Sequence, residues 1–261
     1  MSNELIISAT QDGCRIALLK DKTLVEFHNE EEGSKFTVGD IYLGTVKKVV
    51  QGLNAAFIDV GYDKDAFLHY LDLGPQYNSL QKFTKLVRAK KINGGRLDKF
   101  NLESDIDKHG KITQQLSKGQ QIPVQIVKEP ISTKGPRLSC ELSLAGRYLV
   151  LVPFANAVSV SKKITSGEER KRLLRLIQSI KPENFGVIIR TVAEGKEVAE
   201  LDRDLRTMVK TWEEGMTRLV NASSSERIIG ELDKTSSLLR DMLNESFDNV
   251  HVDDKKIYED V

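Results

Sequence analysis

An arginine and a threonine at the end of an apolar run are the sharpest candidates for binding chemistry. Residues 186–191 read Gly-Val-Ile-Ile-Arg-Thr, so a short buried strand would end at Arg190. A guanidinium at a strand exit can hold a phosphate through two hydrogen bonds, and Thr191 and nearby backbone amides could donate more. A surface ion pair with an acid such as Glu194 is the commoner arrangement for an isolated arginine. Both interpretations remain open from these residues alone.

Two phenylalanines near a pair of lysines indicate a surface on which unpaired bases could stack. Phe57 and Phe67 flank the turn at 59–61, and Lys47 and Lys48 precede them. Aromatics beside lysines on an OB-type barrel are typical of sites for single-stranded nucleic acid. Burial in the core is the alternative, because phenylalanine is usually an interior residue. The pattern around the two rings favours RNA contact.

Apolar residues at strand-like spacing predict the barrel that would carry these rings. Barrel strands are expected near 41–50, 55–60, 66–68, 121–128 and 136–142. Ahead of them, the runs 5–10, 14–20 and 23–28 predict a β-meander of three strands. Together these segments predict a protein that begins with β-structure.

Beyond the barrel, helical and strand-like segments alternate. Ser166 to Glu169 has capping-box spacing and predicts a helix that Pro182 and Gly186 end. A second helix is expected over 198–220, with Trp212 on its buried side, and a last one over about 235–244. The β-α-β-α order from residue 148 onward predicts a compact α/β domain.

A long basic excursion, roughly 74–119, interrupts the expected barrel. Its core is rich in cations and contains the single acid Asp98; the cations are Lys82, Lys85, Arg88, Lys90, Lys91, Arg96 and Lys99. One interpretation is an arm that neutralises an RNA backbone. The other is a solvated, partly mobile loop, and charge patterning does not separate the two.

Taken in order, these motifs resemble the amino-terminal half of the ribonuclease E/G family, from about Glu4 to the end of the chain. The segment GTVKKVVQGLNAAFIDVGYDKDAFLH at 44–69 resembles an S1-type RNA-binding OB fold. SLAGRYLVLVP at 143–153, SKKI at 161–164 and GVIIRT follow in family order. The fold class implied is mixed α/β, with an S1-type barrel inserted after an RNase H-like meander.

The resemblance also implies domain limits. We expect the first part of an RNase H-like segment at 1–36, and an S1 domain at 37–142 with a basic insertion at about 75–119. A 5′-phosphate sensor is expected at 143–234, and 235–261 would begin the returning RNase H-like segment.

Roles for individual residues come from the same resemblance. Phe57 and Phe67 match a base-stacking pair, and Lys134 matches a lysine that contacts RNA near the scissile region. Gly135 would let the RNA strand approach closely. The 5′-monophosphate pocket is implied to contain Gly146, Val150 through its backbone, Lys162, Arg190 and Thr191. With the resemblance, phosphate binding becomes the preferred interpretation of Arg190.

The resemblance places catalysis elsewhere. The family's Mg²⁺-binding aspartates and its zinc-binding cysteine motif belong to a DNase I-like domain, and the chain stops at Val261 before either. No catalytic or metal-binding residue is therefore expected, and homo-oligomers are expected only of the full-length enzyme. The acids of the last nine residues are predicted to be a solvated tail; they are Asp253, Asp254, Glu259 and Asp260.

Composition is consistent with a cytoplasmic RNA-binding protein. The net charge of +1 requires local basic patches for a polyanion, and no apolar run approaches a membrane span. Cys14 and Cys140 lack metal-ligand spacing and are expected to be buried in a reducing compartment. The expected partner is single-stranded RNA with a 5′-monophosphate. Two alternatives are a non-catalytic S1-domain protein of translation or RNA chaperoning, and an OB-fold protein with other partners.

Overall fold

The computed structural model describes residues 2–10, 13–31, 36–92, 94–230, 247–255 and 258. Contacts divide the described residues into two compact units. Unit 1 takes those of 1–37 and 231–261, and unit 2 takes those of 38–230. The helix expected near 235–244 lies outside the described residues.

Unit 1 is a four-stranded sheet in the order β14-β1-β2-β3. Its strands are β1 (Asn3–Thr10), β2 (Gly13–Lys20), β3 (Thr23–Glu31) and β14 (Asn249–Val252). The meander β1-β2-β3 is antiparallel, as predicted, and β14 lies parallel to β1. Asp21 and Lys22 both have positive φ and form the two-residue turn of the β2–β3 hairpin.

Alternating apolar residues give this sheet one buried face. Leu5, Ile7, Cys14 and Ile16 form its core. Asp253, just after β14, is exposed, but it is bonded to the sheet. Its carboxylate accepts hydrogen bonds from the Ser8 hydroxyl at 2.6 Å and the Ala9 amide at 2.7 Å. These bonds lower the pKa of Asp253 and join the end of β14 to β1. Glu259 and Asp260 lie outside the described residues.

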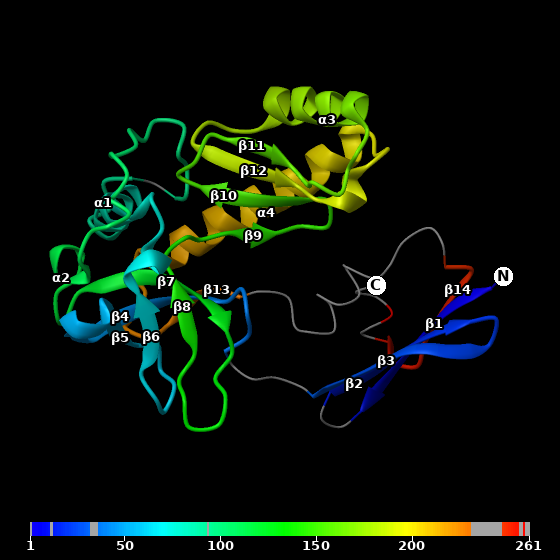
Figure 1. Cartoon of the computed structure of the whole chain (residues 1–261), viewed down its shortest axis with the longest axis horizontal. Coiled ribbons are helices and arrows are strands. Elements are labelled where there is room, and N and C mark those ends of the chain that lie inside the picture. Colours follow the sequence, from blue (N-terminus) through cyan, green and yellow to red (C-terminus); the bar gives the residue numbers. More distant parts are fainter. Residues whose placement is uncertain are drawn as a thin grey trace. The chain divides into compact units, whose positions relative to one another are not determined.

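Unit 2 contains the predicted closed barrel (Figure 1). Its strands are β4 (Ile41–Val50), β5 (Ala55–Asp59), β6 (Ala66–His69), β7 (Gln121–Lys128) and β8 (Arg137–Ser139). The order is β4-β5-β6-β8-β7, and β7 pairs back onto β4. The short strand β13 (Arg227–Ile229) adds to β4. Short 3₁₀ turns, η1 (Gln51–Leu53) and η2 (Tyr70–Leu73), follow β4 and β6.

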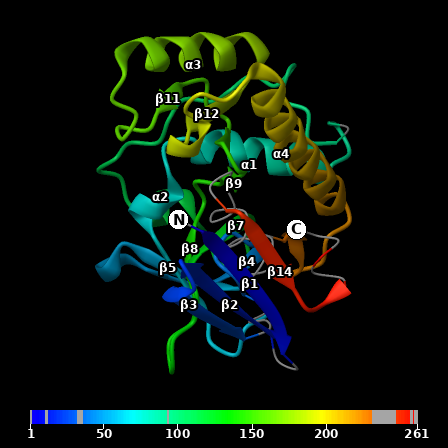
Figure 2. The same cartoon turned by 90° about the vertical axis from the view of Figure 1, so that its right-hand side faces the viewer.

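The basic excursion is a folded part of unit 2, which corrects the prediction of a solvated, partly mobile loop; its contact with RNA stays a prediction. It forms α1 (Tyr77–Arg88) and α2 (Ile112–Gln115), and α1 lies against α4 (Figure 2). The side chains of Phe83 and Phe100 are buried among the aromatic rings of Phe154 and Trp212. Several of its cations have internal partners. Lys82 pairs with Glu103 at 2.5 Å, and Arg88 donates to the Leu219 and Ala222 carbonyls.

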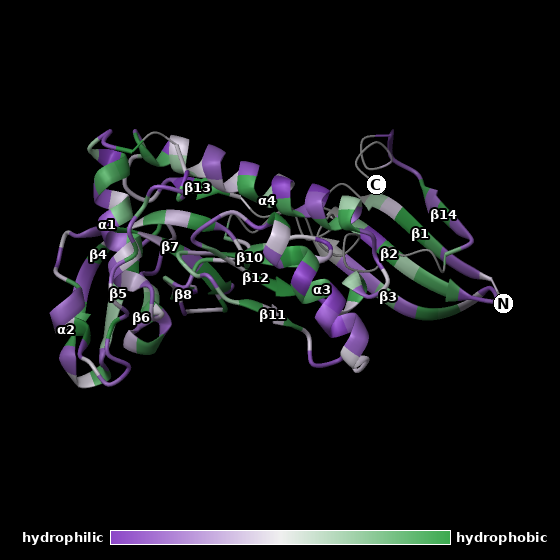
Figure 3. Ribbon diagram, turned by 90° about the horizontal axis from the view of Figure 1, so that it is seen from above, coloured by the Kyte–Doolittle hydropathy of each residue, from purple (hydrophilic) through white to green (hydrophobic). Residues whose placement is uncertain are grey.

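The rest of unit 2 is the predicted α/β region, with strand order β11-β12-β10-β9. Its elements are β9 (Leu144–Ala145), β10 (Leu149–Pro153), β11 (Val158–Val160), α3 (Gly167–Ile180), β12 (Phe185–Ile189), η3 (Thr191–Ala193) and α4 (Val198–Leu219). The Ser166 hydroxyl accepts the Glu169 amide and begins α3, as its spacing predicts. Hydrophobic and hydrophilic residues alternate along α4 (Figure 3).

Trp212 is fully buried, which confirms its assignment to the core. Its indole N–H donates to the Gly95 carbonyl at 2.7 Å, so α4 and the excursion share one core. Cys14 and Cys140 are buried free thiols. None of the helices in the described ranges is long and apolar enough to span a bilayer.

Candidate nucleic-acid interface

One residue from each of the five barrel strands forms a continuous row across the outside of the barrel. The cross-strand pairs are Lys48 with Phe57, Phe57 with Phe67, Phe67 with Arg137, and Arg137 with Lys128. Paired residues of neighbouring strands project from the same face. We call these five side chains the transverse row.

Two β-bulges bring lysines into the transverse row. In β4, Val46 is opposite Ile58 and Lys48 is opposite Phe57, so Lys47 is the extra residue. In β7, Ile126 is opposite Leu138 and Lys128 is opposite Arg137, so Val127 is extra. Val46 and Ile126 therefore point into the core while each lysine, two residues later, points outward.

The transverse row lies in a groove of about 680 Å³. The Phe57 and Phe67 rings are half-buried and meet edge to face, with centroids 5.9 Å apart. The groove is lined by more cations than acids: Lys48, Lys64, Lys128, Lys134 and Arg137 against Asp65 and Glu129. All three residues predicted to bind RNA, Phe57, Phe67 and Lys134, line this groove.

Contacts within the chain position two neighbouring residues, Lys47 and Gly135. Lys47 does not line the groove with Lys48; its ammonium pairs with Asp59 at 3.0 Å, and this hydrogen bond raises the pKa of Lys47. Gly135 does line the groove, but an internal contact accounts for the glycine. A Cβ at this position would collide with the backbone carbonyls of Lys64 and Asp65.

The predicted phosphate-binding residues surround the turn between β9 and β10. The Arg190 guanidinium donates to the Gly146 carbonyl at 2.7 Å, and the Arg190 amide donates to the Tyr148 carbonyl at 2.8 Å. Thr191 shares a hydrogen bond of 3.0 Å with the Ser161 hydroxyl. Lys162 follows Ser161 and is exposed. The structure therefore brings Gly146 to Arg190, and Thr191 to the loop that carries Lys162.

Val150 has strand neighbours on both sides. It is opposite Ala145 in β9 and opposite Ile188 in β12. Its backbone therefore lies within the sheet rather than at an open edge. Its half-buried side chain shares a sheet face with Ile188, whose side chain is 44% exposed.

Asp204, on α4, organises the turn beside Arg190 and was not predicted from the sequence. Its carboxylate accepts the amides of three consecutive residues, Arg147, Tyr148 and Leu149, at 2.9–3.0 Å. A Cβ at Gly146 would lie 2.5 Å from Asp204 Oδ2, so the close approach requires glycine. No local pattern distinguishes Asp204 from the other acids of an amphipathic helix.

The first turns of α3 hold the two loops that carry Lys162 and Thr191. Arg170 donates to the Ser161 carbonyl at 2.7 Å and to the Ile164 carbonyl at 3.1 Å. Glu169 pairs with Arg172 at 2.6 Å and accepts the Gly195 amide at 2.9 Å. Hydrogen bonds from Arg172 and from Gly195 lower the pKa of Glu169 to about 2.

The resemblance implies Mg²⁺ and zinc for the full-length enzymes, with no ligand for either among the residues of this chain. Across the part of the chain that the structure describes, no three His, Cys, Asp or Glu side chains are grouped closely enough to hold an ion. Neither Mg²⁺ nor zinc is therefore assigned a ligand here.

Two family models match the chain, and they meet between the barrel and the α/β region of unit 2. The model of the S1 RNA binding domain matches residues 35–141, and that of the Ribonuclease E/G family matches residues 143–261. Ribonuclease G of Escherichia coli strain K12 is 35% identical over 259 residues, which are 99% of this chain and 49% of that protein.

Two further relatives show a similar level of identity. Ribonuclease G of Haemophilus influenzae is 33% identical over 99% of this chain and 49% of its own length. Ribonuclease E of a Nostoc species is 34% identical over 83% of this chain and 28% of its own. The chain thus spans about half the length of the ribonuclease G relatives it matches.

Proposed function

The chain belongs to the ribonuclease E/G family, and from that premise we propose that it is the RNA-binding, 5′-monophosphate-sensing portion of a single-strand-specific endoribonuclease of RNA processing and decay. The observation that carries the proposal is the transverse row. Aromatic rings at its centre and cations at both ends match the two components of single-stranded RNA, bases and phosphates.

The row favours unpaired RNA over a duplex. Phe57 and Phe67 project from adjacent strands and offer ring surfaces within a groove. A base can stack on such a ring only when it leaves its own stack, which single strands permit at low cost. Lys134 and Lys48 line the same groove, where they can neutralise phosphates of the bound strand.

Recognition of the 5′ end is proposed for the turn beside Arg190. The guanidinium lies at the Gly146 carbonyl, and the Thr191 hydroxyl and the exposed Lys162 are on adjoining loops. A terminal monophosphate carries more charge than an internal phosphodiester, and a planar guanidinium can bind two of its oxygens. A 5′-hydroxyl offers neither feature.

Binding of short oligoribonucleotides that differ only at the 5′ end tests the proposal. The wild-type chain should prefer the monophosphate, and Arg190→Ala should abolish the preference while internal binding persists. Arg190→Lys should retain part of the preference for the monophosphate. A lysine ammonium is a point charge and cannot make the two parallel hydrogen bonds of a guanidinium. Arg175→Ala, an exposed arginine on α3, is the matched control.

Three outcomes would contradict the proposal. Equal affinity of the wild-type chain for monophosphate and hydroxyl ends would remove the sensor and favour the non-catalytic S1 alternative. A preference that Arg190→Ala leaves intact would place the sensor elsewhere. Failure to bind any single-stranded RNA would reject the proposal as a whole.

A further inference from the structure

Arg137 is a member of the transverse row for which neither the sequence nor the resemblance suggested a role. It is opposite Phe67, at the border between β6 and β8, and its side chain is 46% exposed in the groove. Arg137 therefore continues the line of the two aromatic rings onto the next strand, toward Lys128.

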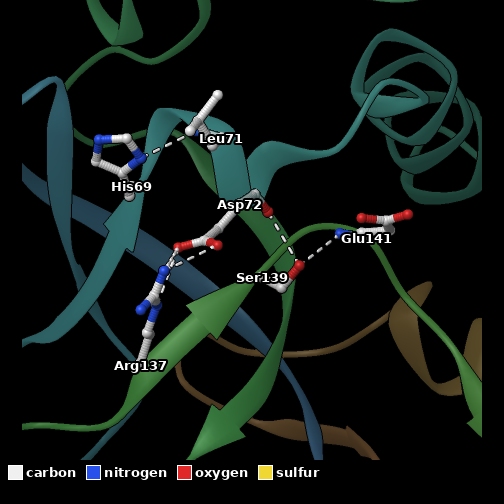
Figure 4. Close-up of polar contacts among 6 residues, drawn as sticks. All are labelled: His69, Leu71, Asp72, Arg137, Ser139 and Glu141. Carbon is white, nitrogen blue, oxygen red and sulfur yellow. Dashed lines mark hydrogen bonds and ion pairs between the residues drawn. The ribbon is translucent and has the colours of Figure 1, made fainter. Parts of the chain in front are cut away.

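Asp72 fixes the orientation of the Arg137 guanidinium (Figure 4). Nε lies 3.1 Å from one carboxylate oxygen, and Nη2 lies 3.0 and 3.2 Å from the two oxygens. This two-point contact sets the plane of the guanidinium, which a single hydrogen bond would leave free to turn.

Asp72 is itself attached to the strand that carries Arg137. Its backbone carbonyl accepts the Cys140 amide at 2.7 Å. The same carbonyl accepts the Ser139 hydroxyl at 3.0 Å (Figure 4). The Ser139 hydroxyl in turn accepts the Glu141 amide at 3.0 Å. The ion pair is therefore anchored at both partners, with Asp72 in η2 and Arg137 in β8, and the two elements are bonded to each other.

This geometry suits a base better than a phosphate. The carboxylate offsets the charge of Arg137, so the pair would release few counterions on binding a phosphate. A guanidinium plane held in one orientation, by contrast, is a surface on which an unpaired base can stack. We propose that Arg137 is a third stacking surface of the groove, next to Phe67, and that Asp72 is a positioning residue for it.

The proposal rests on RNA binding by the groove, and abasic RNA separates the two questions. Oligoribonucleotides of equal length, each with one abasic ribose, are titrated against the wild-type chain. Three positions should then weaken binding, one for each of Phe57, Phe67 and Arg137. Intact RNA that fails to bind the wild-type chain would reject the proposed function, whereas binding with only two sensitive positions would reject this inference alone.

Substitution of Arg137 then identifies the third position. Arg137→Ala should weaken binding of intact RNA about tenfold, within the range for one stacked base. The third abasic position should then have no further effect. Arg137→Lys keeps the positive charge but has no planar group on which a base can stack. Its affinity should therefore depend on the abasic position in the same way as that of Arg137→Ala. Arg206→Ala is the matched control, since Arg206 pairs with Asp202 at 2.6 Å on α4 and does not line this groove.

Salt dependence distinguishes stacking from phosphate contact. Asp72→Asn should weaken the third position by about threefold and steepen the slope of log K against log salt by up to about 0.7, because the arginine charge is no longer offset. Adding Arg137→Ala to Asp72→Asn removes the whole ion pair and should restore the wild-type slope, because the pair carries no net charge. A slope shallower than the wild-type slope by about 0.7 in this double variant, with three sensitive abasic positions retained, would show a phosphate contact and overturn the proposal.

Folding of the variants is checked by Trp212 fluorescence, because this buried residue is the only tryptophan in the chain. If the alanine variant does not fold, Arg137→Lys and Arg137→Gln keep a longer side chain in β8 and carry the same test. A folded variant in which the third position stays sensitive would contradict the assignment.

Discussion

The groove on the barrel and the turn beside Arg190 differ in how their side chains are positioned. In the groove, the backbone ladder of five strands places the transverse row, and four cross-strand pairs fix all five of its positions. At the turn, side chains from α3 and α4 hold backbone groups of three loops. Substitution in the groove should therefore change binding with little loss of folding, whereas substitution at the turn should change both.

The largest expected effect is on stability, from Asp204→Ala. The substitution leaves three amides without their shared acceptor, and hydrogen bonds to charged groups contribute about 1.5–3 kcal/mol each. Because Asp204 is partly exposed and water can replace some of these bonds, we expect a loss of about 3 kcal/mol. Denaturant unfolding followed by Trp212 fluorescence measures it.

Asp202→Ala is the control for that variant, since Asp202 is on the same helix and pairs with the exposed Arg206. The 5′-monophosphate preference should fall together with stability in Asp204→Ala. A variant of unchanged stability that still distinguishes the two ends would show that the turn does not depend on α4.

The contrast between the regions also explains what the sequence could reveal. The barrel, α3, α4 and the core position of Trp212 follow from periodicity and capping, which are local patterns. Asp204 could not be found this way, because it binds amides 55–57 residues earlier in the chain. Lys48 lines the groove and Lys47 does not because of the bulge in β4, which only the register with β5 reveals.

The prediction that the excursion could be a solvated, partly mobile loop was wrong for a related reason. Its many cations suggested a solvated or RNA-bound segment, but its few aromatic residues decide the fold. Phe83 and Phe100 find their partners in Trp212 and Phe154, which are far away in sequence. A charge count describes the outside of such a segment and says nothing about a core completed by another part of the chain.

The next largest effect is expected for the two rings of the groove. Phe57→Ala and Phe67→Ala should each weaken binding of single-stranded RNA by about 1–3 kcal/mol, the range for one stacked base. Each ring is half-buried against the other, so thermal stability is measured in parallel. Phe27→Ala is a control, because that side chain is exposed on β3 of unit 1. Unchanged binding in folded Phe57 or Phe67 variants would remove the stacking role.

Lys134→Ala should have a smaller effect that depends on salt. An exposed lysine in the groove is expected to contact one phosphate, so its loss should make the slope of log K against log salt shallower by about 0.7. At high salt the variant and the wild-type chain should bind alike. Lys118→Ala is a control on an exposed lysine that does not line the groove. An effect of the same size at every salt concentration would contradict a phosphate contact.

The smallest effect is expected from the pH dependence of Glu169. Its pKa falls from 4.5 to about 2 in the folded chain, mainly because Arg172 and the Gly195 amide bind the ionised carboxylate. A lowered folded-state pKa adds stability above the unfolded-state value of 4.5, and that stability is lost as pH falls from about 4.5 to about 2. Since the pair with Arg172 is partly exposed, the contribution should not exceed about 1 kcal/mol.

Glu169→Gln tests this dependence, because glutamine keeps the shape of the side chain without titrating. Unfolding free energies measured from pH 6 to pH 2 should converge for the two proteins at the acid end and separate above pH 4.5. Glu168→Gln, an exposed neighbour at the start of α3, should follow the wild-type curve. Because Glu169 also holds the Gly195 loop beside Thr191, the 5′-monophosphate preference should weaken in Glu169→Gln while binding in the barrel groove stays the same. Parallel losses at both regions would mean that they are not positioned independently.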